Sequence, residues 1–110
     1  MIQMIIASLY KRQVTKTYNE NKTFVCNFVL EYRDEFDNLH KVSCFMYNQE
    51  PIAIENNRYL VELEIYATQN VTYKSDRVWL TQSRVLKMEP LMNELEEIGA
   101  KEIIKKYYKR

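Results

Sequence analysis

The segment LYKRQVTKTYNENKTF, residues 9–24, alternates basic side chains with aromatic rings. Only Glu20 carries the opposite charge, so the segment is locally positive. Its cations and rings are Lys11, Arg12, Lys16 and Lys22, and Tyr10, Tyr18 and Phe24. Rings stack on nucleobases and cations neutralise phosphates, and a single strand of nucleic acid offers both groups at each nucleotide. The pattern therefore favours a surface for single-stranded nucleic acid.

Residue types that carry catalysis or bind metals are sparse. His40 is the only histidine and follows a polar turn, so we expect it at an exposed strand end. Cys26 and Cys44 lack metal-ligand spacing and lie in apolar segments, which favours inert core thiols in a reducing compartment over a redox pair. With glycine only at Gly99, no glycine-rich phosphate loop can form. We expect no enzyme activity, catalytic residue, metal or cofactor.

Composition indicates one globular domain without an overall charge bias. The chain has 110 residues, 46% of them hydrophobic, which is enough for a core. Sixteen Lys and Arg against fifteen Asp and Glu give a net charge of +1, so an anion-binding surface must be local. The apolar start is too short and too polar for a signal peptide or a membrane span. We therefore expect a cytoplasmic protein with no membrane partner.

Apolar residues recur at a spacing of two from residue 2 to residue 88, where β-branched and aromatic residues are frequent. This pattern predicts strands at residues 1–13, 22–33, 40–48, 58–70 and 76–88. We expect a polar turn between the second and third strands, and a short connection or one helical turn at residues 48–57. Five short strands without alternating helices favour a small antiparallel barrel.

Strand alternation assigns side chains to two faces. Phe24, Phe28 and Tyr59 share a face with aliphatic residues and are expected in the core. Trp79 is left open between an outer wall, a subunit interface and a stacked base. Asparagine is expected at left-handed turn positions, because glycine is nearly absent. The functional residues expected on the outer face are Lys41, Phe45, Tyr47 and Tyr66.

The pattern changes at Pro90, where a helix can start. An apolar stripe with intervals of four and three residues is formed by Leu91, Leu95 and Ile98. This stripe would pack on the barrel or, alternatively, dock on a partner. Gly99 is expected to end or bend the helix. The expected organisation is a barrel domain and a helical segment, residues 1–90 and 91–110.

The stretches at residues 9–36, 41–48 and 59–90 follow one another in an order that resembles bacterial and phage single-stranded DNA-binding proteins. The resemblance covers residues 2–90 and depends on strand order, apolar spacing and the closing VWLTQSRVLKMEP. It implies an all-β fold, a five-stranded antiparallel OB-fold barrel with a C-terminal helix.

The resemblance also implies positions for the binding residues. It places stacking rings near Phe36, Tyr47 and Tyr73. Tyr18, from the opening segment, joins the expected set. The cations expected along the path of the strand are Lys11, Arg12, Lys16, Lys22, Arg33, Lys74, Arg77 and Arg84.

The chain departs from the family in three places. Ala7, Ser8 and Glu64 stand near positions where the family has glycine in its first and fourth strands, so the barrel must curve without them. The helix between the third and fourth strands is shortened. An acidic tail tip is replaced by a charged segment ending in KKYYKR, so recruitment of enzymes through such a tip is not expected.

The expected function is non-catalytic, largely sequence-independent binding of single-stranded DNA in replication, recombination or transfer of a phage or mobile element, with RNA left open. We expect a homodimer or homotetramer, because a small barrel leaves strand edges to cover, and no small-molecule substrate. The alternative is a protein-interaction adaptor in a replication or conjugation complex. The near-neutral charge and the C-terminal stripe favour that alternative.

Overall fold

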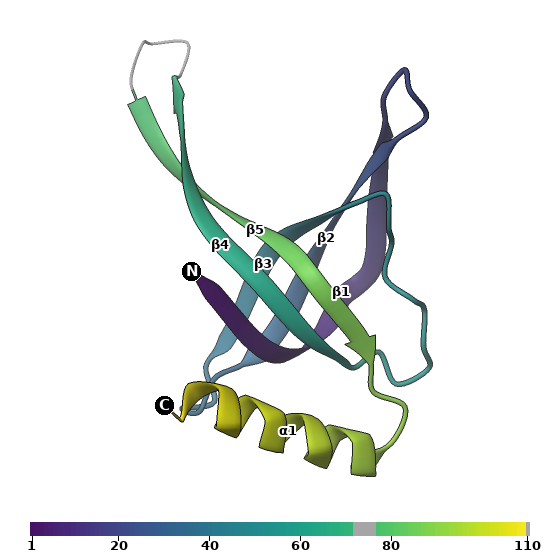
Figure 1. The fold of residues 1–110 in the computed structure, drawn as a ribbon, viewed down its shortest axis with the longest axis vertical. Coiled ribbons are helices and arrows are strands. Elements are labelled where there is room, and N and C mark those ends of the chain that lie inside the picture. Colours follow the sequence, from purple (N-terminus) through teal and green to yellow (C-terminus); the bar gives the residue numbers. More distant parts are fainter. Residues whose placement is uncertain (72–76, 110) are drawn as a thin grey trace.

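A computed structural model describes residues 1–71 and 77–109 and, outside residues 66–81, their side chains. Its elements are β1 (Ile2–Tyr18), β2 (Phe24–Arg33), β3 (Leu39–Tyr47), β4 (Tyr59–Val71), β5 (Arg77–Pro90) and α1 (Glu94–Tyr108) (Figure 1). The strands form a closed barrel in the order β1-β2-β3-β5-β4. The expectation of a mainly β, OB-fold-like barrel with one C-terminal helix is confirmed.

The strand pairing is antiparallel apart from one short contact among the described strands. β3 and β5 meet in parallel at Cys44 and Phe45, and this contact closes the barrel. The β1–β2 and β4–β5 pairs continue beyond the barrel as two ribbons on the same side, while α1 lies across the opposite end (Figure 1). The radius of gyration, 15.6 Å, accordingly exceeds the value of about 13 Å typical of a compact 100-residue domain.

β1 changes its partner halfway along its length. Its first half pairs with β4 and its second half with β2, with a register shift between Leu9 and Val14. Lys11 and Arg12 lie in this shift with φ of 52° and 50°. That left-handed conformation costs a non-glycine residue about 1–2 kcal/mol, and such bulges bend and twist a strand. The barrel therefore curves through an irregular strand instead of through the glycines of the resembled family.

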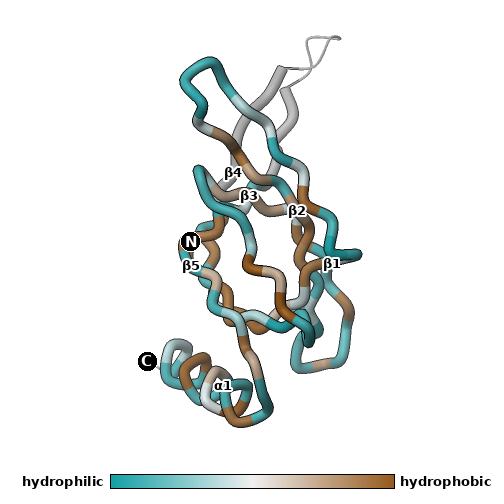
Figure 2. Tube along the Cα trace, turned by 90° about the vertical axis from the view of Figure 1, so that its right-hand side faces the viewer, coloured by the Kyte–Doolittle hydropathy of each residue, from teal (hydrophilic) through white to brown (hydrophobic). Residues whose placement is uncertain are grey.

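Apolar side chains from all five strands fill the barrel. Figure 2 shows apolar residues recurring along the strands. Phe28 and Tyr59 are buried and Phe24 packs against them from the margin, as expected. Cys26 and Cys44 are buried, free thiols. Burial raises the pKa of Cys44 to about 12, so this thiol is protonated at neutral pH and is a poor nucleophile.

Asparagine takes two of the left-handed turn positions, as expected. Asn48 and Asn57 have φ of 54° and 52°. The Asn57 side chain also donates to the Leu9 carbonyl at 2.8 Å and accepts from the Leu9 N–H at 3.3 Å. It therefore provides hydrogen-bond partners for the backbone N–H and carbonyl of Leu9, just after β1 stops pairing with β4. The connection from β3 to β4 contains no helical turn.

The C-terminal helix starts later than the sequence indicated and continues further. Pro90 belongs to β5, where it pairs with Tyr59, and Asn93 caps α1 by accepting from the Glu96 N–H at 2.9 Å. α1 continues through Gly99 without a break, so the expectation that Gly99 ends the helix is wrong. Acidic residues in the first turn and lysines in the last stabilise the helix dipole and offset the weak helix propensity of one glycine.

The expected stripe of α1 does not pack on the barrel as a whole, although Leu91 is buried there. Leu95 and Ile98 are 79% and 51% exposed, whereas Ala100 is buried with Leu60 and Leu91. The helix carries apolar residues on two sides, and the side with the small Ala100 allows closer approach to the barrel. Within the described residues, no helix is both long and apolar enough to cross a membrane.

Gly99→Ala should stabilise the protein by about 0.5–1 kcal/mol, because alanine lowers the entropy cost of the helix. An added Cβ at this position would meet no atom within 4 Å. Thermal and urea unfolding measure the change. Ala100→Gly, one residue further, should destabilise the protein; if both variants shifted stability in the same direction, the assigned helix face would be wrong.

Candidate nucleic-acid interface

Cross-strand register brings one row of side chains together on the outside of the barrel. Thr15 of β1 pairs with Asn27 of β2, Asn27 with Phe45 of β3, and Phe45 with Arg84 of β5. Directly paired residues point to the same side of a sheet. We call the surface around this row the aromatic face, and its residues are Tyr10, Lys11, Asn27, Lys41, Ser43, Phe45, Tyr47 and Arg84.

At one margin of the aromatic face, Tyr47 is held between a ring and a cation. The Phe45 and Tyr47 ring centroids are 5.3 Å apart with the planes at 75°, an edge-to-face arrangement. The Arg84 guanidinium carbon lies 5.4 Å from the Tyr47 centroid, within cation–π range. Tyr47 is 53% exposed, so it offers ring surface to a ligand beside a fixed positive charge.

At the other margin, Tyr10 is surrounded by two lysines. The Lys41 ammonium is 4.0 Å from the Tyr10 ring centroid and that of Lys11 is 5.2 Å from it. Hydrogen bonding from Lys41 and then from Lys11, together with their charges, lowers the pKa of Tyr10. Lys11 reaches this ring from its left-handed position in β1, so the bulge also positions a cation.

Two shallow hollows lie between these margins. One, of about 320 Å³, is lined by residues that include Phe45, Tyr47 and Gln82. The other, of about 250 Å³, is bordered by Tyr10. Asn27 and Ser43 line both hollows, so these two side chains mark where the hollows meet.

The aromatic face continues toward the β1–β2 turn through a second ring pair. The Tyr18 and Phe24 centroids are 5.5 Å apart, and both residues line a hollow with Tyr47. The Lys16 ammonium lies 5.5 Å from the Phe24 centroid, but it is also 2.6 Å from the Glu50 carboxylate. This ion pair holds one of the expected cations away from the path of a ligand.

Two expected binding residues lie elsewhere. Phe36 and Arg33 are at the β2–β3 turn, whereas Tyr47 pairs with Val25 at the far end of the same ladder. Eight residues of strand separate the two ends, or about 26 Å. Phe36 and Tyr47, which the resemblance places among the stacking rings, therefore lie at opposite ends of the β2–β3 ladder. Arg33 instead donates to the Asp37 carbonyl at 2.9 Å within its own turn.

The remaining expected residues divide between other contacts and undescribed positions. Arg12 donates to the Glu55 carbonyl at 2.5 Å, and Lys22 is exposed in the β1–β2 turn. Tyr73 and Lys74 lie outside the described residues, and Tyr66 and Arg77 are described in backbone only.

Sequence reasoning did not assign a binding role to Tyr10, Asn27 or Ser43. Tyr10 was visible as a ring beside Lys11, but its contact with Lys41 depends on the bulge. Asn27 stands between Cys26 and Phe28, which are buried, so alternation alone indicated that it faces outward. No local pattern indicates that Asn27 and Ser43 line the same hollows.

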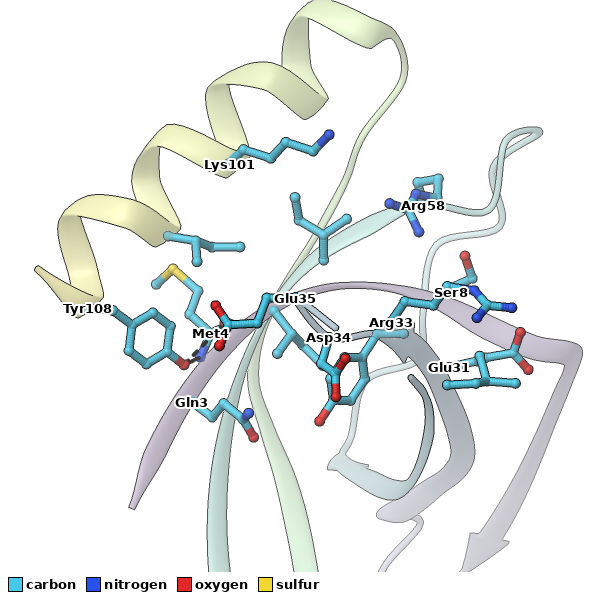
Figure 3. Close-up of a pocket in the computed structure, with 15 residues that line it drawn as sticks. Gln3, Met4, Ser8, Glu31, Arg33, Asp34, Glu35, Arg58, Lys101 and Tyr108 are labelled. Atoms are coloured by element: carbon cyan, nitrogen blue, oxygen red, sulfur yellow. Dashed lines mark hydrogen bonds between the residues drawn. The ribbon is translucent and has the colours of Figure 1, made fainter. Parts of the chain in front are cut away.

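A hollow of about 720 Å³ lies between β1, the β2–β3 turn and α1 (Figure 3). Tyr108 of α1 crosses it, accepting from the Met4 N–H at 2.9 Å and donating to the Met4 carbonyl at 3.3 Å. Arg58 of the hollow forms a 2.5 Å ion pair with Glu97 of the helix. These contacts attach α1 to the end of the barrel opposite the two ribbons (Figure 1).

The turn beside this hollow is organised by Asp34. Its carboxylate accepts from the backbone N–H groups of Phe36 and Asn38, each at 2.9 Å, and lies 2.7 Å from His40 Nε2. His40 is exposed and stacks on Tyr32, as its place at a strand end indicated. Hydrogen bonding from His40, then from Asn38, lowers the pKa of Asp34 to about 2.

Within the part of the chain that the structure describes, no group of three or more His, Cys, Asp or Glu side chains could hold a metal ion. Comparison with protein-family models gives no match, and a search of curated proteins gives none.

Asp34→Asn should remove a pH-dependent part of the stability while keeping an acceptor for the turn. The pKa of Asp34 in the folded protein, about 2, lies below its ordinary value of 3.8. The ionised side chain therefore stabilises the fold above pH 3.8, and this contribution is lost as the pH falls through 2. The difference in melting temperature between wild type and variant should narrow from pH 5 to pH 2. A constant difference would contradict the assignment.

Proposed function

We propose that this protein binds single-stranded nucleic acid, primarily DNA, on the aromatic face and without catalysis. The observation that carries the proposal is that two rings on one sheet face each have a cation beside them, the half-buried Tyr10 with Lys41 and the exposed Tyr47 with Arg84. Bases can stack on such rings while the neighbouring cations neutralise the phosphates that connect them.

The electrostatics of the aromatic face support the proposal despite the small net charge. Lys11, Lys41 and Arg84 border the aromatic face, and the register places Glu31 opposite Lys41 and Glu64 opposite Arg84, while no salt bridge joins either of these described pairs. The charges of Lys41 and Arg84 are instead directed to the rings of Tyr10 and Tyr47. A polyanion on the face therefore meets local positive charge.

The resemblance in strand order to bacterial and phage single-stranded DNA-binding proteins supports the same function. A role in replication, recombination or transfer of a phage or mobile element belongs to the proposal, as does a homodimer or homotetramer. Mass in solution, measured with and without a 35-mer oligonucleotide, tests the oligomeric state. A monomer under both conditions would contradict the proposed homodimer or homotetramer.

Titration with oligo-dT should quench the emission of the tyrosines and tryptophan, with affinity falling as salt rises. Three phosphate contacts, from Lys11, Lys41 and Arg84, predict a slope of log K against log salt of about −2. Lys41→Gln should reduce the slope by about 0.7, whereas Lys105→Gln, at the end of α1, should leave it unchanged. Absence of binding at low salt would end the proposal.

Two exposed rings provide a matched test of the location. Tyr47→Ala should weaken binding by about 5- to 150-fold, the loss of one stacked base. Phe36→Ala removes a ring that is 77% exposed at the other end of the β2–β3 ladder and should leave affinity unchanged. Thermal melts establish that both variants fold. The reverse order of effects would move the site to the other end of the barrel.

Glu50→Gln should strengthen binding, because it releases Lys16 from a 2.6 Å ion pair at the margin of the site. An exposed ion pair contributes up to about 1 kcal/mol, so the gain should be at most about fivefold, with a steeper salt dependence. Glu89→Gln breaks the comparable pair with Lys87, away from the aromatic face, and serves as the control. Equal effects of the two variants would contradict this assignment.

A second candidate function is a protein-interaction adaptor. The outward side of α1 supports it, because Leu95 and Ile98 are exposed although the helix is anchored to the barrel. Retention of a partner after nuclease treatment, lost in Leu95→Lys and accompanied by no oligonucleotide binding, would favour this function over the first.

A further inference from the structure

The centre of the aromatic face differs in chemistry from its margins. Asn27 and Ser43 line both central hollows, and both side chains are exposed. Among the described residues, neither side chain has a hydrogen-bond partner. Their neighbours along the strands on the same face include Val25 and Val29, which are half-buried. The centre is therefore uncharged, partly apolar and supplied with unused donors and acceptors.

The cations lie on either side of this centre. Lys41 and Lys11 gather at Tyr10, and Arg84 lies over Tyr47. A phosphate gains most binding free energy beside these charges. A neutral polar group can exchange its hydrogen bonds with water for hydrogen bonds to an amide and a hydroxyl at little cost in free energy. If phosphates are bound at the margins, the part of a nucleotide left for the centre is the base.

A side-chain amide has a particular complementarity to nucleobases. Asn27 offers one carbonyl acceptor and two N–H donors in a plane. The Watson–Crick edge of each nucleobase presents a donor and an acceptor side by side, and an amide can turn to match either order. An amide at this position therefore contacts any unpaired base without selecting a sequence.

We propose that Asn27, assisted by Ser43, contacts the Watson–Crick edge of one unstacked base and thereby distinguishes single strands from duplex. This inference rests on the proposed function and adds the group that senses whether a base is already paired. In a duplex that edge is occupied by the opposite strand, so the contact is lost while phosphate contacts remain. Asn27 is then a specificity-determining residue, and the rings and cations supply the rest of the affinity.

The contact can be tested with oligo-dT and with the same oligonucleotide made from N3-methylthymidine. The methyl group blocks the N3–H donor of the Watson–Crick edge and leaves the ring face and the phosphates in place. The wild-type protein should bind the methylated oligonucleotide about two- to tenfold more weakly, the effect of one lost hydrogen bond. Asn27→Ala should bind both oligonucleotides equally, at the affinity of the wild type for the methylated one.

Two further variants control the experiment. Asn27→Val keeps a residue suited to a strand and secures a folded protein without the amide. Gln49→Ala removes an exposed amide that lines a different hollow and should keep the wild-type preference. Equal binding of both oligonucleotides by the wild type, or an unchanged preference in Asn27→Val, would overturn the inference and leave the proposed function standing. If the wild type bound neither oligonucleotide at low salt, the proposed function would fail with it.

Discussion

The barrel depends on one strand that serves two neighbours. β1 pairs with β4 in its first half and with β2 in its second, and the change requires the left-handed residues Lys11 and Arg12. Backbone in this conformation is costly without glycine, so the paired segments on both sides must hold it in place. The same irregularity brings Lys11 to the ring of Tyr10. Closure of the fold and construction of the aromatic face are therefore consequences of one local distortion.

The aromatic face shows how a nearly neutral protein can present an organised positive surface. Lysine and arginine side chains are long, and fixing them normally costs rotamer entropy. Contact with Tyr10 and Tyr47 restricts Lys41 and Arg84 before any ligand arrives. Where a cation is held by a carboxylate instead, as Lys16 is by Glu50, its charge is partly cancelled. The choice of neighbour, ring or acid, decides which cations are ready for an anion.

Much of the fold was predictable because alternation is a local property. Buried Cys44 and Met46 and outward Phe45 and Tyr47 follow from a spacing of two. The position of Phe36 in the β2–β3 turn also followed from the sequence, but its grouping with Tyr47 came from the resemblance, and the two residues lie at opposite ends of the β2–β3 ladder.

Features without a local signal were missed for related reasons. Nothing in the residue types of Lys11 and Arg12 indicates left-handed backbone. The side of α1 that packs on the barrel is decided by the fit of the small Ala100, and the more hydrophobic Leu95 stays exposed. The shared lining of the hollows by Asn27 and Ser43 is likewise a property of packed strands.

The burial of both cysteines has a practical consequence. Cys26 and Cys44 are enclosed by the barrel, and the high pKa of Cys44 keeps that thiol protonated under ordinary labelling conditions. A cysteine introduced on the exposed side of α1 would then react far faster with a maleimide dye than either native thiol. The wild-type core can accordingly be left intact when a fluorophore or a surface linkage is attached to this protein.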